Sequence, residues 1–207
     1  LEDFALLTDS DALRSALADA GVMLAEGVIA AGHSYGAWIA QLAGGATLFN
    51  MDPLPEDFRA AQTAIIGVVA LSPPGPVPDR ILLEDWENVD RPMLVVTGTT
   101  DILPGFIDDW RLHMASFEVA RLAPAYALVF EGQDHYFNGA FGRPRDDIDA
   151  AAAAALATLN EYAADFMALV GAGRLPDADA WQAQATSTVE VHVSRHTNEL
   201  LQQGEEN

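Results

Sequence analysis

The sequence contains no cysteine and no lysine. Without cysteine there is no disulfide framework, no thiolate nucleophile and no cysteine-ligated zinc site, while the redox compartment stays open. The 10 basic residues are therefore all arginines, and with 31 acidic residues they leave a net charge of −21. A surface of this charge repels phosphate backbones and anionic lipid headgroups, so we expect neither nucleic acid nor a membrane surface as a partner.

Long apolar runs are also missing from the sequence. No stretch of about 18 or more uninterrupted apolar residues occurs, which argues against a transmembrane helix. Half of the residues are hydrophobic, and we find neither a polar low-complexity tract nor an internal repeat. A chain of 207 residues is long enough for one well-packed domain and short for two, so we expect a single domain over residues 1–207.

Four short apolar runs predict buried strands: 28–31, 65–71, 93–97 and 126–130. Helical patterns alternate with them: 13–20 behind a capping Ser10, 37–49, 104–117 and 147–170. Strands that are apolar on both faces and are separated by helices predict a parallel sheet with helices on both faces, and hence an α/β fold. Residues 72–91 form the longest irregular segment, and residues 186–207 read as an uncertain tail in which 188–194 alternate like a strand.

The pentapeptide Gly32-His33-Ser34-Tyr35-Gly36 stands between the first predicted strand and the helix that follows it. A serine between two glycines at such a junction is typical of a nucleophile elbow, which holds the hydroxyl above the carboxyl ends of the strands. We expect both glycines to be required, because a side chain there would collide with neighbouring backbone. Ser34 is the predicted nucleophile and the Tyr35 N–H a predicted oxyanion donor. The alternative is an ordinary serine in a tight turn.

Candidates for an acid and a base follow two other predicted strands. A serine hydroxyl is a weak nucleophile that needs an imidazole base, and the imidazole needs an orienting carboxylate. Asp101 comes four residues after the strand at 93–97, and His135 comes five residues after the strand at 126–130. Because the carboxyl ends of parallel strands meet at one edge, we expect both side chains to lie beside Ser34, with Asp101 as acid and His135 as base.

Other residues compete for these two roles. Asp108 or Asp134 could replace Asp101 as the acid. The remaining histidines are His33, His113, His192 and His196. The side chain of His33 should point away from the reaction centre, and His113 falls inside a predicted helix. Only the pair at 192 and 196 has the spacing of a helical metal site, and it lies in the tail, so we expect no metal.

Four motifs together resemble a known family: Gly32-His33-Ser34-Tyr35-Gly36, Leu71-Ser72-Pro73-Pro74-Gly75, Thr97-Gly98-Thr99-Thr100-Asp101 and Asp134-His135-Tyr136. Over about residues 4–170 the chain resembles the bacterial α/β-hydrolases, among them the dienelactone-hydrolase-like and platelet-activating-factor-acetylhydrolase-like serine esterases. The resemblance implies an α/β-hydrolase fold without a cofactor, which hydrolyses a small-molecule carboxylic ester through an acyl-enzyme. It assigns Ser34 as nucleophile, Asp101 as acid, His135 as base and the Tyr35 N–H as an oxyanion donor. True dienelactone hydrolases use cysteine where this chain has Ser34, which argues against that lactone chemistry.

The family fold places about four strands before the elbow helix, and none is predicted upstream of residue 28. The loop that gives the second oxyanion N–H belongs to that part of the fold, and loss of one donor costs about 100- to 1,000-fold in turnover. The strand at 28–31 would also form a bare apolar edge. We therefore expect the chain to be the C-terminal portion of the fold, with an N-terminal segment or a second copy completing the sheet.

The segment 72–91 joins two strands at the catalytic end, which predicts a short lid. We expect Trp86 within it, and Phe106 and Tyr136 beside the acid and the base, to bind substrate; packing against the sheet is the alternative for each. A lid this short favours small or medium acyl groups. Two further hypotheses stay open: the same triad acting on thioester, amide or carbon–carbon substrates, and a non-catalytic relative that retains the sheet.

Overall fold

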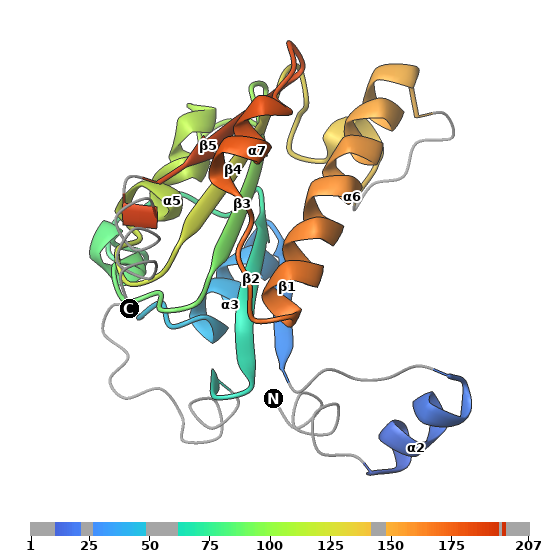
Figure 1. The fold of residues 1–207 in the computed structure, drawn as a ribbon. Coiled ribbons are helices and arrows are strands. Elements are labelled where there is room, and N and C mark those ends of the chain that lie inside the picture. The colour runs from blue at the N-terminus through green and yellow to red at the C-terminus, as the bar shows by residue number, and fades with distance from the viewer. Residues whose placement is uncertain (1–10, 22–26, 49–61, 142–147, 195, 198–207) are drawn as a thin grey trace.

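The computed structural model describes residues 11–21, 27–48, 62–141, 148–194 and 196–197. Within them a five-stranded sheet has the order β1-β2-β3-β4-β5, so the order across the sheet repeats the order along the chain (Figure 1). The strands are β1 (Val28–His33), β2 (Ile65–Leu71), β3 (Met93–Gly98), β4 (Ala125–Phe130) and β5 (Val189–Val193). Strands β1 to β4 are parallel, and β5 pairs with β4 in the antiparallel sense.

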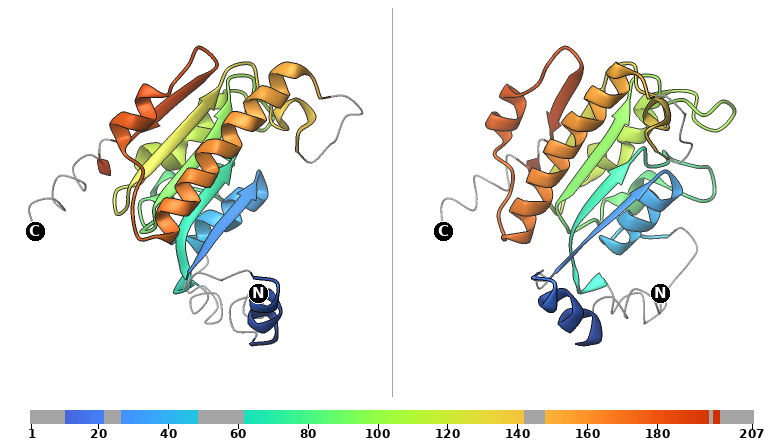
Figure 2. Two further views of the ribbon diagram at one scale, coloured as in Figure 1. Left: turned by 45° about the vertical axis from the view of Figure 1, so that its right-hand side comes forward. Right: turned by 90° about the vertical axis from the view of Figure 1, so that its right-hand side faces the viewer.

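Helices cover both faces of this sheet. The α-helices are α2 (Asp11–Asp19), α3 (Tyr35–Ala43), α5 (Ala115–Val119), α6 (Ala150–Gly171) and α7 (Ala178–Ala183). The described residues also contain three short 3-10 helices in the connections that follow β2, β3 and β4: η1 (Leu83–Trp86), η2 (Trp110–Met114) and η3 (Phe137–Gly139). Helix α6 runs across one face, and α3 and α5 lie on the other (Figures 1 and 2). No helix in the described part of the chain has the length and apolar character needed to cross a bilayer.

Successive residues of a strand pack into two separate hydrophobic cores, one on each face of the sheet. On β3, Met93 and Val95 pack in the core that contains α3 and α5, whereas Leu94 and Val96 pack in the core that contains α6. This alternation follows from the two-residue period of a strand. Every residue of β3 and β4 is buried, which explains why their sequences are continuously apolar. The outer strand β1 is only partly buried.

The predicted strands are all present, and the predicted run at 188–194 is strand β5. The helix predicted at 147–170 is α6, which begins one residue after Asp149. The Asp149 side chain accepts a hydrogen bond from the N–H of Ala152 and so caps the first turn. The predicted helix cap Ser10 and the last residues of the tail, 198–207, lie outside the described part of the chain.

Two predicted helices have the wrong extent. Residues 104–107, the expected first turn of the helix at 104–117, instead lie in a turn closed by a bridge between Leu103 and Ile107, with Gly105 at a φ of 78°. A right-handed helix cannot pass through that angle, so η2 begins only after Asp109, whose side chain caps it. The helix predicted at 37–49 ends at Ala43, because Gly44 follows and Gly45 has a φ of 109°.

The segment 72–91 is the crossover from β2 to β3, and the lid expected there stays a prediction. Three of its large apolar residues, Ile81, Trp86 and Val89, belong to the core beside α3, whereas Leu83 is 46% exposed. Trp86 is 0% exposed, donates its indole N–H to Gln41 Oε1, and packs edge-on against Trp38. A side chain enclosed in this way cannot touch a substrate, which corrects the expectation that Trp86 binds one.

Candidate active site

Ser34 occupies the turn between β1 and α3. Its backbone has a φ of 57° and a ψ of −121°, a region that residues other than glycine seldom adopt. The N–H of Ser34 donates to the Leu71 carbonyl at 2.8 Å, and the Ser34 carbonyl accepts from the N–H of Ala37 at 2.9 Å. The turn is therefore held from the sheet and from the helix at once, and the Ser34 side chain remains half-buried.

The two glycines of the pentapeptide have different surroundings. A Cβ at position 32 would overlap the carbonyl group of Gly36, so Gly32 has to lack a side chain. A Cβ at position 36 would meet no atom of the described residues within 4 Å. The expectation that both glycines are required is right for Gly32 and wrong for Gly36.

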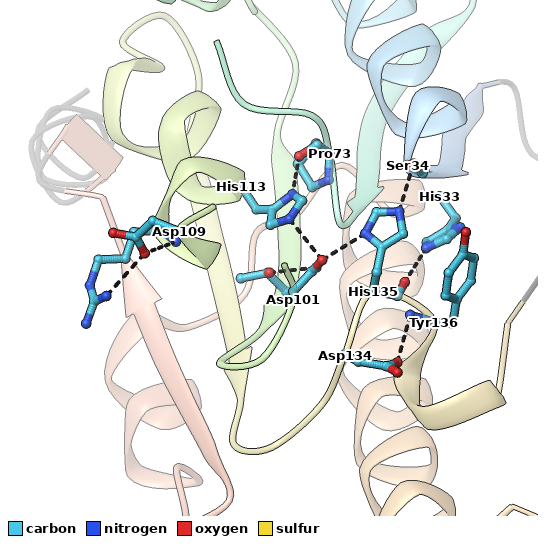
Figure 3. A network of polar contacts seen from close by, with 11 residues as sticks. His33, Ser34, Pro73, Asp101, Asp109, His113, Asp134, His135 and Tyr136 are labelled. Carbon is cyan, nitrogen blue, oxygen red and sulfur yellow. Dashed lines mark hydrogen bonds and ion pairs between the residues drawn. The ribbon is translucent and has the colours of Figure 1, made fainter. Parts of the chain in front are cut away.

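Ser34, His135 and Asp101 form a continuous chain of polar contacts (Figure 3). His135 Nε2 lies 2.9 Å from Ser34 Oγ, and His135 Nδ1 lies 2.8 Å from Asp101 Oδ1. An ionised carboxylate only accepts hydrogen bonds, so Nδ1 carries the proton and Nε2 is left to accept one from the Ser34 hydroxyl. The structure thus brings together three residues that follow β1, β3 and β4, in an arrangement that can remove the serine proton.

Asp101 is enclosed and ionised. It is 0% exposed, and its Oδ2 accepts a hydrogen bond from Thr97 Oγ1 at 3.0 Å. Burial raises the pKa of Asp101, but the contacts from His113 and His135 outweigh burial and hold the pKa well below its ordinary value. A carboxylate that stays charged can balance the positive charge that develops on His135 as it accepts a proton.

The loops that carry the acid and the base are joined to each other. The N–H of Thr100 donates to the Gln133 carbonyl at 3.2 Å, and the N–H of Gly132 donates to Thr99 Oγ1 at 2.9 Å. Gly98 lies so close to Gln133 that a Cβ would overlap its carbonyl group. These contacts fix the distance between the Asp101 loop and the His135 loop.

The two alternative acids serve other purposes. Asp134 Oδ1 accepts hydrogen bonds from the backbone N–H groups of Tyr136 and Asn138, so it stabilises the turn after His135. Asp108 Oδ1 accepts from the N–H of Gly105 and is exposed. Of the three aspartates considered, only Asp101 contacts the ring of His135.

The other predicted site residues lie around the elbow and its neighbouring loops. Tyr35 is the first residue of α3, so its N–H has no acceptor within the helix, and its side chain is 70% exposed. Tyr136 is half-buried, with its ring edge-on to His135 at a centroid distance of 5.1 Å. Phe106 is 56% exposed on the loop that follows Asp101.

The side chain of His33 was expected to point away from the site, but it lies against His135. Its ring centroid lies 4.8 Å from that of His135, and its Nε2 lies 2.6 Å from the His135 carbonyl oxygen (Figure 3). Burial lowers the pKa of His33. The neutral ring with a proton on Nε2 donates to that carbonyl and so ties the elbow to the backbone of the base.

His113 is a site residue that the sequence interpretation missed. It comes from η2, is 1% exposed, and places Nε2 2.9 Å from Asp101 Oδ1. The sequence shows no spacing that links a residue in this short helix to a strand end. A histidine between the apolar residues Leu112 and Met114 is the one signal that could have marked it.

Asp101, His113 and His135 are also the described residues that are grouped closely enough to hold a metal ion. The ligand atoms of the three lie within 4.8 Å of one another. A metal would need a lone pair from His135 Nδ1, which here donates its proton to Asp101. We therefore interpret this group as a hydrogen-bond and charge network.

Two surface hollows in the described residues lie away from Ser34. One, of about 460 Å³, is lined by residues of α5, α7 and β5, among them Phe117 and His192. The other, of about 550 Å³, lies at the amino ends of β2 and β3 and includes Arg91 and Arg174. Neither hollow contains Ser34, Asp101 or His135 among its lining residues.

No protein-family model matches the chain, and no curated protein matches it. Among solved structures, the chain is similar to a puromycin hydrolase mutant complexed with PGG, at 18% identity and a TM-score of 0.38 over 73% of this chain and 24% of that chain. It is also similar to a puromycin-hydrolyzing peptidase of Mycobacterium tuberculosis, at 16% identity and a TM-score of 0.36 over 61% of this chain and 21% of that chain. A further puromycin hydrolase structure gives 18% identity and a TM-score of 0.35 over 72% and 24%.

The chain thus spans about a quarter or less of the length of these structures, and the similarity is too distant to assign a family. The fold and the site still define a structural class. It is a mostly parallel α/β sheet that holds a hydrogen-bonded serine, histidine and aspartate at the carboxyl ends of its strands.

Proposed function

We propose that this protein is a serine hydrolase of the α/β-hydrolase fold, with Ser34 as nucleophile, His135 as general base and Asp101 as the orienting acid. The observation that carries the proposal is the unbroken contact chain from Ser34 Oγ through His135 to a buried carboxylate. The strained turn at Ser34 adds to it, because strain of about 1–3 kcal/mol persists chiefly where function requires a fixed side-chain position.

The geometry supports acyl transfer in two steps. Ser34 Oγ attacks the carbonyl carbon of the substrate while its proton moves to His135 Nε2, and the protonated ring then gives this proton to the departing alcohol oxygen. The resulting acyl group is bonded to Ser34 Oγ. Water attacks it, gives a proton to His135, and releases the carboxylic acid as Ser34 recovers its hydroxyl proton. Asp101 stays ionised throughout.

The oxyanion formed in each step is assigned to the N-terminus of α3. The N–H of Tyr35 is the donor that the helix leaves unused, and the positive end of the helix dipole lies with it. Strand β1 ends at His33, immediately before Ser34, and is a partly buried outer strand among the described residues. A strand added beside β1, from an N-terminal segment or from a second copy, would therefore end next to Ser34, and we assign the second donor to it.

We propose carboxylic esters with small or medium acyl groups as the substrates. The elbow is open to solvent at Tyr35 and Gly36, and large apolar residues of the crossover 72–91 pack into the core. Tyr136, which lies against His135, and the exposed Phe106 are the apolar surfaces that we assign to substrate contact. Thioesters, amides and carbon–carbon substrates use the same triad chemistry, so a substrate panel is what separates these classes.

The test is covalent labelling by a fluorophosphonate probe, together with hydrolysis of p-nitrophenyl acetate and butyrate. The wild type should be labelled and Ser34→Ala should not, whereas Ser15→Ala, which changes an exposed serine of α2, should be labelled like the wild type. Asp101→Asn should slow labelling strongly and the exposed Asp108→Asn should not. A folded wild-type chain that the probe never labels would contradict the proposal and favour a non-catalytic relative.

A further inference from the structure

A second imidazole, that of His113, reaches the carboxylate of Asp101. The two rings approach from different elements, His135 from the loop after β4 and His113 from η2, and their centroids are 5.8 Å apart. Both place a nitrogen against the same oxygen, Asp101 Oδ1, at 2.8 Å from His135 and 2.9 Å from His113. The mechanism proposed above uses the first ring and gives no part to the second.

The partners of His113 define which nitrogens carry protons. Its Nδ1 lies 2.6 Å from the Pro73 carbonyl oxygen, which only accepts, so Nδ1 is a donor (Figure 3). Its Nε2 faces the ionised carboxylate of Asp101, against which a bare lone pair would be repelled. No directed hydrogen bond joins Nε2 to Oδ1, so their 2.9 Å approach is a close polar contact that depends on where the ring is held.

The position of the His113 ring is fixed by close packing of its surroundings. The loop that begins at Ser72 presses against η2, because a Cβ on Gly75 would lie 2.7 Å from the Cβ of Leu112. The side chains of His113 and Asp101 are 0% exposed. Three titratable groups from other elements face the ring or lie near it: Asp101 after β3, His135 after β4 and His33 at the end of β1. The charged neighbours on its own element, Asp109 and Arg111, pair with each other at the surface.

We propose that His113 is a positioning residue, a buried imidazole that is anchored to the Pro73 carbonyl and fixes the Asp101 carboxylate against His135. This inference rests on the proposed function. Thr97 holds Oδ2 and His113 holds Oδ1, so the carboxylate presents one fixed oxygen to His135 Nδ1. Without the His113 ring the Asp101 carboxylate would have room to turn, and His135 would lose the contact that orients it.

The experiment measures the rate of fluorophosphonate labelling in the full chain. His113→Phe retains a flat ring without donors, and we expect its labelling rate to fall about 10- to 100-fold. His113→Gln retains a donor for the Pro73 carbonyl, and we expect it to recover most of that loss. His192→Gln, on the half-buried β5 position away from the triad, is the matched control and should keep the wild-type rate. A structural role alone would lower the melting temperature without separating the labelling rates of the glutamine and phenylalanine variants.

The second readout needs no variant to be active. In ¹⁵N-histidine-labelled wild type, nuclear magnetic resonance should show a slowly exchanging proton on His113 Nδ1, which donates to the Pro73 carbonyl, and His113→Gln should remove that signal. If this variant does not fold, Gln variants at the other histidines assign the signal by elimination. The absence of such a signal, or wild-type labelling rates in both His113 variants, would overturn the inference. A wild type that is not labelled at all would overturn the proposed function instead, and the resonance spectrum would still report the hydrogen bond of His113.

Discussion

Gly32 and Gly36 flank Ser34 symmetrically in the sequence and differ in what they allow. A side chain at position 32 would overlap the backbone of residue 36, whereas a side chain at 36 would enter open space. The elbow therefore depends on one glycine for its shape. At the scale of single residues, the Gly-x-Ser-x-Gly pattern does not show which glycine is required. The position of each glycine before or after the turn decides that.

Alanine substitutions at these glycines should separate the two positions. We expect Gly32→Ala to lower the free energy of unfolding by about 1–3 kcal/mol, because the backbone has to shift to relieve the overlap. Gly36→Ala lies in the first turn of α3 and should leave stability unchanged or raise it by up to about 1 kcal/mol. Urea unfolding of both variants checks this, and equal losses in the two would contradict it.

The buried acid should make stability depend on pH. The pKa of Asp101 is lower in the folded chain than its ordinary value of about 4, so its stabilising effect is fully present above that pH and is lost as the pH falls toward the folded value. We expect the difference in unfolding free energy between wild type and Asp101→Asn to be largest near pH 7 and to narrow below about pH 4. Urea unfolding at several pH values, with Asp108→Asn as the control for loss of one charge, measures it.

The sequence could predict that Ser34, Asp101 and His135 lie together because each follows a recognisable strand. Their positions after β1, β3 and β4 place them at one edge of a parallel sheet, whatever the loops do. His113 could not be found in this way, because η2 reaches Asp101 through a turn at Gly105 that no periodicity encodes. The burial of Trp86 could not be predicted either, because its core position depends on a buried partner, Gln41, from α3.

At the scale of elements, the strands could be predicted from the sequence because they are buried on both faces of the sheet. All residues of β3 and β4 are buried, and their continuous apolar sequences set their bounds closely. Helix ends were less predictable, because one residue with a positive φ is enough to stop a helix and periodicity does not show it. Gly45 and Gly105 both act in this way, after α3 and before η2.

The cap of α6 can be tested by itself. Asp149 accepts from the N–H of Ala152 at 2.7 Å, and α6 covers the core face that contains Leu94 and Val96. We expect Asp149→Ala to lower the free energy of unfolding by about 1 kcal/mol and Asp149→Ser to retain most of it. Urea unfolding measures both, and a serine variant as unstable as the alanine variant would argue that the cap contributes nothing.

The junction of the acid and base loops is a second element-scale test. We expect Gly98→Ala to force the Asp101 loop away from Gln133, lowering the unfolding free energy by about 1–3 kcal/mol and slowing fluorophosphonate labelling. Gly171→Ala is the control, because a Cβ there meets no atom within 4 Å. Labelling at the wild-type rate in a folded Gly98→Ala chain would show that the loops keep their positions without this close approach.

At the scale of the whole molecule, a net charge of −21 on 207 residues sets up self-repulsion in the compact state. Salt screens such charges beyond about 10 Å at 0.1 M. We therefore expect the melting temperature to rise between 20 mM and 500 mM NaCl, conditions chosen to span roughly 20 Å down to 4 Å of screening length. Thermal unfolding in sucrose of equal osmolality is the control, and an equal rise there would assign the effect to solvent exclusion.

The order of strands across the sheet repeats their order along the chain, from β1 to β4. During biosynthesis each strand can therefore join the edge left by the one before it, without waiting for a later partner. Ser34 leaves the ribosome early and His135 last of the three. A nascent polypeptide shorter than β4 and its loop carries Ser34 without His135, so the proposed triad cannot assemble until β4 and that loop have docked.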